Sequence, residues 1–460
     1  MPISPSEFVE NLNDPKKVFL SYAAKISPVK FTLLLEHFAD KADDVFYYCE
    51  PERNISFLSF DKLTKQSFQS GEFDKLSSEI TALKSKLVTN HKDYKNFNLP
   101  VFILSGKFPI KSSSEEWKDF GDIDFIVPKI ILYQNSNDCF LVANLFSESF
   151  SNQGYFNDFL EHEADLIYKL EAKLTRSNFD RTTILKNNSN ADDAAWIENI
   201  SKVIGKIKNE NIEKVVISRR IENEIKSGLS WQQTIEKLNN KYPSCTNFLY
   251  KSANSIFFGS TPEVLINFSQ NKFSTESLAG SIKRGETVEM DKILEQDLLK
   301  SEKNQKEHQA VIDHIKNAIN NFVSEINIVE TPVIKKLPNI QHLQTNIDGT
   351  LEENTDMFSV ISAIFPTPAV CGIPKELSLK MIEQTEIFDR GLFSGIIGWF
   401  NADDYGEFFV TIRSALVKGN KLYAYAGCGI LESSDPNEEF EETQLKLKPI
   451  LSLFDYAVKS

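Results

Sequence analysis

Continuous or alternating hydrophobic runs along the chain predict β-strands, and apolar residues spaced three or four apart predict helices. The expected strands are residues 99–105, 122–133, 212–219, 255–265 with a central turn, 408–412 and 422–426. The expected helices are residues 31–38, 155–175 and 290–322, and a final helix that begins at Asp435-Pro436. Lys418-Gly419-Asn420 is typical of a hairpin turn and is expected to join the last two strands.

The order of these elements indicates the fold class. Strands and helices are mixed without strict alternation, which favours an α/β fold of the mixed α+β type, with mainly antiparallel sheets flanked by helices. The segment from Lys186 to Asp193, with three Asn and one Ser, is the best candidate for a loop between two parts. We therefore expect an N-terminal part at residues 1–190 and a second part at residues 191–460, joined in one structural unit.

Charge and cysteine content limit the classes of partner. The 460 residues include 65 Asp and Glu against 51 Lys and Arg, a formal net charge of -14. Nucleic acid and anionic membrane surfaces are repelled by such an exterior, so neither is expected as a partner. Five cysteines without a C-x-x-C pair favour reduced thiols over disulfides or zinc. Without a signal-peptide pattern at the N-terminus, these thiols predict a cytoplasmic protein.

Acidic residues on two of the predicted helices are candidates for a metal site. Glu439, Glu442 and Lys446 are spaced so that they share one face of the final helix. Glu307 lies four residues before Val311 on the apolar stripe of the long helix, where a carboxylate is either at the rim of the core or paired with a cation. A solvated helix face is the ordinary explanation of the first pattern. Two acidic faces that met in the fold would suit Mg²⁺.

Lys214 and Glu263 are the candidates for proton transfer. Lys214 lies within an apolar strand on the side of Ile212 and Val216. It is therefore either a lysine at the edge of a sheet or a desolvated base with a lowered pKa. Glu263 follows the turn Gly-Ser-Thr-Pro, which would hold its carboxyl group rigidly. It is either a surface residue or a general acid with a raised pKa.

Small residues and one arginine are candidates for ligand contacts. The steps at Gly280-Ser281 and Gly427-Cys428-Gly429 would let backbone N–H groups approach a ligand, although ordinary turns have the same composition. Arg413, within an expected strand at 410–414, suits bidentate binding of a carboxylate or a structural ion pair. His342 is a single histidine without the partners of a catalytic triad.

Taken in order, these stretches resemble the chorismate-utilising enzymes, which include isochorismate synthase, salicylate synthase, anthranilate synthase component I and aminodeoxychorismate synthase component I. The matching stretches are EKVVISRR (213–220), FFGSTPEVLI (257–266), ESLAGSIKRG (276–285), SEKNQKEH (301–308), QHLQT (341–345), FPTPAVCGIP (365–374), FDRGLFSGIIGW (388–399), FFVTIRSA (408–415), YAGCGI (425–430) and EEFEETQLKL (438–447). The match covers residues 210–450 and is looser before them, at SGKFP (105–109) and WKDFGDIDFIVP (117–128). Residues 191–460 are thereby identified as a chorismate-binding catalytic core.

The resemblance implies a role for each candidate residue. Lys214 would activate water, and Glu263 would be the general acid. The cofactor would be Mg²⁺, and the carboxylates expected to bind it are Glu307, Glu439 and Glu442. The residues expected to hold or line the substrate chorismate are Arg413, Lys446, Gly427, Gly429, Gly280, Ser281, His342 and Thr345.

Three positions bear on the reaction within the family. Isochorismate and salicylate synthases have a lysine at the position of Lys214, which amine-adding relatives do not keep. Ala279 stands where aminodeoxychorismate synthase has its catalytic lysine, and Phe393 stands where salicylate synthases have tyrosine. The resemblance thus implies an isochorismate synthase that adds water at C2 of chorismate and loses the C4 hydroxyl. No glutaminase subunit is expected.

Two alternatives remain open at this point, a salicylate synthase and a non-catalytic ligand-binding member of the fold. Isochorismate would feed either menaquinone or siderophore synthesis. Asn304 departs from the family pattern, since many relatives have an acid there. The departure removes one potential charge near the expected metal.

Overall fold

The computed structural model describes residues 19–94, 96–110, 114–146, 153–174, 182–186, 190–226 and 228–456. Two largely antiparallel sheets are joined by the long strands β3 (Ile55–Phe68) and β6 (Ile123–Asn135), which pair along their length. The first half of β3 and the second half of β6 belong to one sheet, and the remaining halves belong to the other. This agrees with the fold class expected from the sequence.

The first sheet runs in the order β4, β1, β7, β6, β3, β2, β10, β11, β20, β21, β9, with β8 and β17 also paired to β9 and β22 paired to β8. The bounds of its further strands are β1 (Phe19–Ile26), β2 (Asp44–Glu50), β4 (Leu87–Thr89), β7 (Asp138–Phe146), β8 (Thr183–Lys186), β9 (Lys214–Ile225), β10 (Thr246–Ser252), β11 (Ser255–Thr261), β17 (Gly372–Ile373), β20 (Ser414–Lys418), β21 (Lys421–Ile430) and β22 (Asp455–Tyr456).

The second sheet continues from β6 in the order β5, β18, β19, β12, β13, β16, and both β14 and β15 pair with β16. Its bounds are β5 (Phe102–Gly106), β12 (Val264–Ser269), β13 (Lys272–Lys283), β14 (Val323–Ile328), β15 (Val333–Lys336), β16 (Ile340–Leu351), β18 (Ile396–Phe400) and β19 (Tyr405–Val410). The pairings β2–β10 and β5–β18 join strands from either side of residue 190. The division into two parts at that residue stays a prediction.

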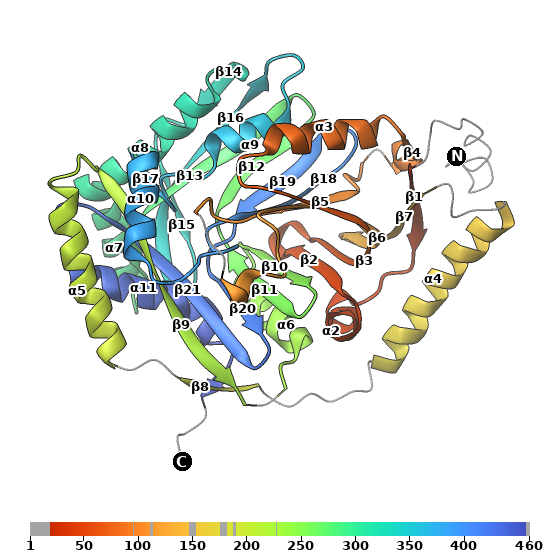
Figure 1. Ribbon diagram of the computed structural model, residues 1–460, viewed down its shortest axis with the longest axis horizontal. Coiled ribbons are helices and arrows are strands. Elements are labelled where there is room, and N and C mark those ends of the chain that lie inside the picture. Colours follow the sequence, from red (N-terminus) through yellow and green to blue (C-terminus); the bar gives the residue numbers. More distant parts are fainter. Residues whose placement is uncertain are drawn as a thin grey trace.

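Side chains alternate between two faces along these strands, and the inner faces of both sheets share one aromatic core. In β19, for example, Phe409 belongs to this core, whereas Phe408 and Val410 belong to the outer face of the second sheet. Helices cover both outer faces, with α2 and α6 on the first sheet and α3, α8 and α9 on the second (Figure 1). The architecture is therefore a pair of sheets between two layers of helices.

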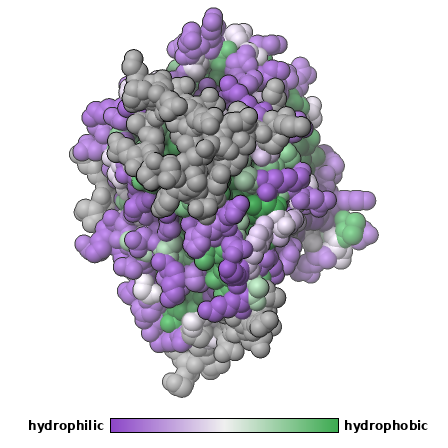
Figure 2. Space-filling view, turned by 90° about the vertical axis from the view of Figure 1, so that its right-hand side faces the viewer, coloured by the Kyte–Doolittle hydropathy of each residue, from purple (hydrophilic) through white to green (hydrophobic). Residues whose placement is uncertain are grey.

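The helices and short 3₁₀ turns have the following bounds: α2 (Phe31–Lys41), α3 (Phe73–Lys84), α4 (Gln153–Leu174), α5 (Asn190–Ile207), α6 (Trp231–Lys241), α7 (Val288–Lys300), α8 (Glu302–Ile319), α9 (Met357–Ile364), α10 (Lys375–Thr385), α11 (Pro436–Leu451), η1 (Pro51–Arg53), η2 (His91–Tyr94) and η3 (Glu115–Trp117). Within the described ranges, no helix is long and apolar enough to cross a membrane. On the face turned toward the viewer in Figure 2, the described residues are mostly hydrophilic.

The single helix expected at residues 290–322 is wrong, because the segment forms α7 and α8 with a break at Ser301. The N–H of Ser301 still donates to Leu298 O at the end of α7, at 3.3 Å. Its side-chain oxygen accepts from the N–H of Asn304 and so caps the start of α8, at 3.3 Å. The apolar spacing of residues 311–319 is correct, but it carries no information about this cap.

The strands near the C-terminus also differ from expectation. The chain leaves β19 after Val410, and β20 precedes β21, so the turn at Lys418-Gly419-Asn420 joins β20 to β21. Arg413 lies between strands with φ of 51°, not inside a strand. In the loop expected from Lys186 to Asp193, residues 190–193 begin α5 and residues 187–189 lie outside the described residues.

Phe257 tests the core between the sheets. Its ring is fully buried and lies 5.4 Å from the Trp117 ring and 5.5 Å from the Phe248 ring, centroid to centroid. We expect Phe257→Ala to lower the free energy of unfolding by about 3–5 kcal/mol, because it removes apolar contacts and leaves a cavity. Urea unfolding measures the change. Val288→Ala, at a residue 67% exposed, should stay within about 0.5 kcal/mol, and equal losses would contradict the assignment.

Candidate active site

A cavity of about 650 Å³, including the part open to solvent, lies where α8 and α11 approach β9, β13, β16 and β21. Its lining residues are Val216, Pro262, Glu263, Leu278, Ala279, Gly280, Ser281, Glu307, His342, Ala369, Val370, Phe393, Ser394, Ile412, Arg413, Ala426, Gly427, Gly429, Glu442 and Lys446. Residues from all ten matching stretches, and most of the expected site residues, thereby meet in one place.

The Lys214 side chain lies behind the cavity wall, and its ammonium group forms an ion pair with Glu307. The Lys214 Nζ to Glu307 Oε1 distance is 2.7 Å, and the lysine side chain is 4% exposed. Val216, on the same side of β9, lines the cavity, as strand alternation predicts. Burial alone would raise the pKa of Glu307, but the charge and hydrogen bond of Lys214 outweigh it and lower that pKa. The carboxylate on the apolar stripe of α8 is thus paired with a cation.

Gly429 makes room for this lysine. A Cβ at Gly429 would lie 2.5 Å from Lys214 Cε, closer than two carbon atoms can approach. Gly429 pairs with Val216 in the β21–β9 ladder, so the lysine crosses the strand beside its own. Gly429 therefore leaves the space that the Lys214 side chain occupies, in addition to lining the cavity.

Glu263 lies in the cavity wall between β11 and β12 and is buried. Burial, and next the charge of Glu276, raise the pKa of Glu263 to about 7. Thr367 Oγ1 donates to Glu263 Oε1 at 3.4 Å, and Val410 N donates to the backbone oxygen of Glu263 at 3.1 Å. A rigid carboxyl group that is half protonated near neutral pH suits proton donation.

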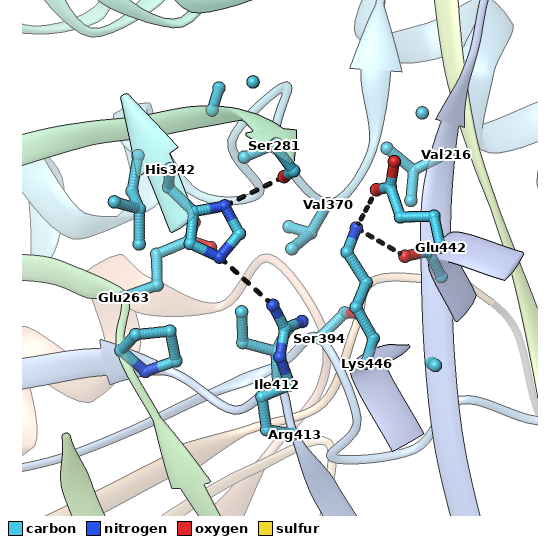
Figure 3. A pocket seen from close by; sticks show the side chains of 18 of the residues that line it. Val216, Glu263, Ser281, His342, Val370, Ser394, Ile412, Arg413, Glu442 and Lys446 are labelled. Atoms are coloured by element: carbon cyan, nitrogen blue, oxygen red, sulfur yellow. Dashed lines mark hydrogen bonds and ion pairs between the residues drawn. The ribbon is translucent and has the colours of Figure 1, made fainter. Parts of the chain in front are cut away.

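His342 and Arg413 form a second wall (Figure 3). Arg413 Nη2 lies 3.3 Å from His342 Nε2, and His342 Nδ1 lies 2.8 Å from Ser281 Oγ. Burial, and then the charges of Arg413 and Lys446, hold the pKa of His342 well below its usual value. Because Arg413 only donates, the neutral ring accepts at Nε2 and donates from Nδ1 to Ser281.

The Arg413 guanidinium has no carboxylate partner among the described residues within ion-pair distance, and its buried Nε lacks a hydrogen-bond partner. Its left-handed backbone is held by a hydrogen bond from Ser260 N to Arg413 O at 3.1 Å. Gly259 permits this approach, since a Cβ there would lie 2.8 Å from Arg413 O. A buried guanidinium with free donors at a cavity is suited to an anionic ligand.

Lys446 and Glu442 face one another on the other side of the cavity (Figure 3). Lys446 Nζ lies 2.6 Å from Glu442 Oε1 and donates to Gly427 O at 2.9 Å. Glu439, one turn earlier on α11, accepts from Ser434 Oγ at 2.7 Å. Its pKa is raised by burial and by the nearby charge of Glu442. The expected acidic face of α11 is therefore directed inward.

Thr345 and Gly280 differ in how they meet the cavity, since Gly280 lines it and Thr345 does not. Thr345 does not line this cavity; its hydroxyl lies 2.7 Å from Nε2 of the buried His308. Gly280, at φ of 76°, forms a bulge in β13 and packs against Asn304. Asn304 Oδ1 accepts from Ser281 N at 3.1 Å, so the residue that departs from the family pattern supports the backbone beside His342.

A buried ion pair that the sequence reasoning missed holds two wall segments together. Arg390 is fully buried and pairs with Glu386. Arg390 Nη1 donates to Val370 O at 2.8 Å and Nη2 donates to Val216 O at 2.7 Å, and Glu386 accepts from Ser218 N. Arg390 lies within the matching stretch FDRGLFSGIIGW, and this motif is the feature of the sequence that points to it. The pair fixes Val216 and Val370 relative to each other.

The carboxylates of α8 and α11 are chemically suited to bind a hard divalent cation. Glu307, Glu439 and Glu442 line a hollow that adjoins the cavity, and carboxylate oxygens are the ligands preferred by Mg²⁺. As the side chains stand, the described residues include no group of three or more His, Cys, Asp or Glu arranged to hold a metal ion. Each carboxylate is instead paired with a lysine. The donor set fits, provided that these pairs rearrange.

Comparison with known proteins places the chain in the family described as "Chorismate binding enzyme", which it matches over residues 7–455. The chain belongs to this family, as the sequence motifs indicate. It is 28% identical over 445 residues to isochorismate synthase MenF of Bacillus subtilis, covering 95% of this chain and 93% of that one. It is 34% identical over 252 residues to the salicylate biosynthesis isochorismate synthase of Pseudomonas aeruginosa, covering 55% and 53%.

The fold is also that of a solved relative. The structure of MenF, the menaquinone-specific isochorismate synthase from Escherichia coli, superposes with a TM-score of 0.75 at 20% identity. The superposition covers 97% of this chain and 99% of that one. At this identity the likeness concerns the fold.

The raised pKa of Glu263 can be tested directly. We expect its carboxyl group to titrate near 7, and to titrate at lower pH in Glu276→Gln, because the second cause of the rise is the charge of Glu276. Infrared difference spectroscopy follows the carboxylic acid band, which Glu263→Gln assigns by removing it. A band that titrates near 4.5, the ordinary value, would contradict the buried environment.

Proposed function

We propose that the protein is an isochorismate synthase, which converts chorismate to isochorismate. The observation that carries the proposal is that three features meet at one cavity. They are the Glu263 carboxyl group with its raised pKa, the Lys214–Glu307 ion pair, and the Arg413 guanidinium without an anionic partner among the described residues. The names of the relatives, isochorismate synthases from several organisms, support the same activity.

Substrate binding follows from the charges. Chorismate is a dianion, and the protein carries a formal charge of -14, so the site must reverse the surrounding field. Arg413 donates to one carboxylate from a buried position. Lys446 reaches the cavity from α11 and contributes a second cation, and Gly280, Gly427 and Gly429 allow close approach of the ligand to the backbone. The neutral His342 orients the guanidinium without adding charge.

Two proton transfers complete the reaction. The first transfer uses the neutral amine of Lys214, which takes a proton from a water molecule, and the oxygen of that water forms a bond to C2 of the ring. The double bonds shift, the bond from C4 to its hydroxyl breaks, and Glu263 gives that hydroxyl a proton so that it leaves as water. One water enters and one leaves, which makes the reaction an isomerisation. The acid needs a raised pKa, as burial provides for Glu263.

We further propose Mg²⁺ as the cofactor, with Glu307 and Glu442 as ligands and Glu439 beside them. When bound, it would supply positive charge that orients the substrate carboxylate and stabilises developing negative charge. Glu307 also accepts a hydrogen bond from the Lys214 ammonium, so the same carboxylate positions the proposed base. Glu439, with its raised pKa, is relieved of repulsion from Glu442 when positive charge is nearby.

Water is favoured as the nucleophile over ammonia because Lys214, the residue assigned to activate water, stands beside the cavity. The proposal therefore includes no glutaminase subunit. Salicylate synthase shares the first step and then eliminates pyruvate. Phe393 lines the cavity and stacks on Tyr425, with ring centroids 5.2 Å apart, and brings no hydroxyl to hold an intermediate. This favours release of isochorismate.

Incubation of the protein with chorismate and Mg²⁺ alone tests the activity. Chromatography should show isochorismate, and Lys214→Ala should lose turnover because the base is gone, while Lys306→Ala on the same helix as Glu307 should keep it. Salicylate and pyruvate formed in equal amounts without an isochorismate phase would indicate a salicylate synthase. An inactive wild-type protein that still binds chorismate would indicate a non-catalytic member of the family.

The metal ligands can be tested with Glu307→Gln. Loss of one anionic ligand should raise the Mg²⁺ concentration needed for half-maximal activity by about 10- to 100-fold. The matched control is Glu302→Gln, an exposed residue of the same helix. Mg²⁺ titration of the rate, and calorimetry without substrate, give the two readouts. An unchanged metal requirement in Glu307→Gln would move the metal to other residues.

A further inference from the structure

Each of the three carboxylates assigned to the metal is paired with a different lysine. Glu307 pairs with Lys214 at 2.7 Å, Glu442 with Lys446 at 2.6 Å, and Glu439 with Lys303 at 3.2 Å. The first two lysines have roles in the proposed reaction, as base and as substrate contact. The third has none, although it lies in the stretch SEKNQKEH that carries Glu307.

Lys303 differs from the other two lysines in its freedom to move. Its side chain is 40% exposed, whereas those of Lys214 and Lys446 are 4% and 14% exposed. Lys446 also donates to Gly427 O, which anchors it to β21. Only the ion pair with Glu439 is shown for the Lys303 ammonium. A lysine on a flexible four-carbon stem at a solvent opening can leave its partner at little cost.

Glu439 cannot leave in the same way. Its side chain is 4% exposed and bonded to Ser434, so it needs a positive charge close by. Lys303 supplies that charge from α8 and lies with Glu307, Glu439 and Glu442 around one hollow. All three carboxylates act on the Lys303 ammonium through their charges. The ammonium therefore neutralises the group of oxygens that a divalent cation would use.

Asn304 does not compete for this role. Its amide is engaged with Ser281 N through Oδ1 and with Ser301 Oγ through Nδ2, at 3.1 and 2.8 Å. Two lysines line this hollow, Lys283 on β13 and Lys303 on α8, and of these only Lys303 lies within ion-pair distance of one of the three carboxylates, among the described residues.

We propose that Lys303 is an internal counter-cation of the metal site, which holds Glu439 in the metal-free protein and is displaced into solvent when a divalent cation binds. The inference rests on the metal site of the proposed function. It makes Lys303 a positioning residue that sets metal affinity through competition. Removing its charge should therefore tighten metal binding, whereas removing a ligand weakens it.

Calorimetric titration of the protein with Mg²⁺, without chorismate, measures this effect. Lys303→Met keeps most of the side-chain volume and removes the charge, so the dissociation constant for Mg²⁺ should fall by about three- to tenfold, as expected for loss of a partly exposed ion pair. Lys303→Arg keeps the charge and should stay near the wild-type value. Lys306→Met, an exposed lysine on the same helix that does not line this hollow, should have no effect.

A second readout is the melting temperature. Lys303→Met should melt lower than wild type without Mg²⁺, because Glu439 is left buried without its partner, and should gain more from added Mg²⁺. Circular dichroism establishes whether Lys303→Met is folded. If Lys303→Met does not fold, Lys303→Gln is measured in its place. Equal or weaker Mg²⁺ binding by the folded neutral variant overturns the competition. Absence of Mg²⁺ binding in the wild type would instead overturn the metal site itself.

Discussion

The cavity and the hollow beside it hold charges of both signs, and a charge that is buried there needs a partner. Glu307, Glu439 and Glu442 are balanced by three lysines, whereas Arg413 has no anionic partner within ion-pair distance among the described residues. A buried charge without a partner costs several kcal/mol, on the order of 3–5 kcal/mol when one partner is removed. The unpaired guanidinium is therefore the position at which an anionic ligand gains most.

This balance depends on backbone features at a distance from the ligand. Gly429 leaves the space through which Lys214 reaches Glu307, and Gly259 lets Ser260 hold the left-handed backbone of Arg413. Arg390 ties the wall strands together through backbone oxygens. These contacts set the positions of Lys214 and Arg413, and of the wall segments that carry Val216 and Val370. Catalytic groups require such placement, since a loose site loses the benefit of pre-organisation.

The proposed acid and the proposed base differ in their surroundings. Glu263 is buried near Glu276, and both effects raise its pKa, which favours the protonated form near neutral pH. Lys214 Nζ is held 2.7 Å from the Glu307 carboxylate by an ion pair. Lys214 lies on β9 and Glu263 on the connection between β11 and β12, so the two groups come from different parts of the first half of the catalytic core.

The sequence by itself determined the family, the mixed fold and most of the strands, because alternation and ordered motifs are local properties. It also determined that Glu307 and Lys214 were unusual, since each is a charge on an apolar face. Only the tertiary structure decided that they pair with each other, that Ser301 divides one expected helix into two, and that Thr345 lies behind the wall. Caps, ion pairs and burial depend on which distant segments meet. The role of Lys303 belongs to the same class, because its only ion-pair partner among the described residues lies 136 residues along the chain.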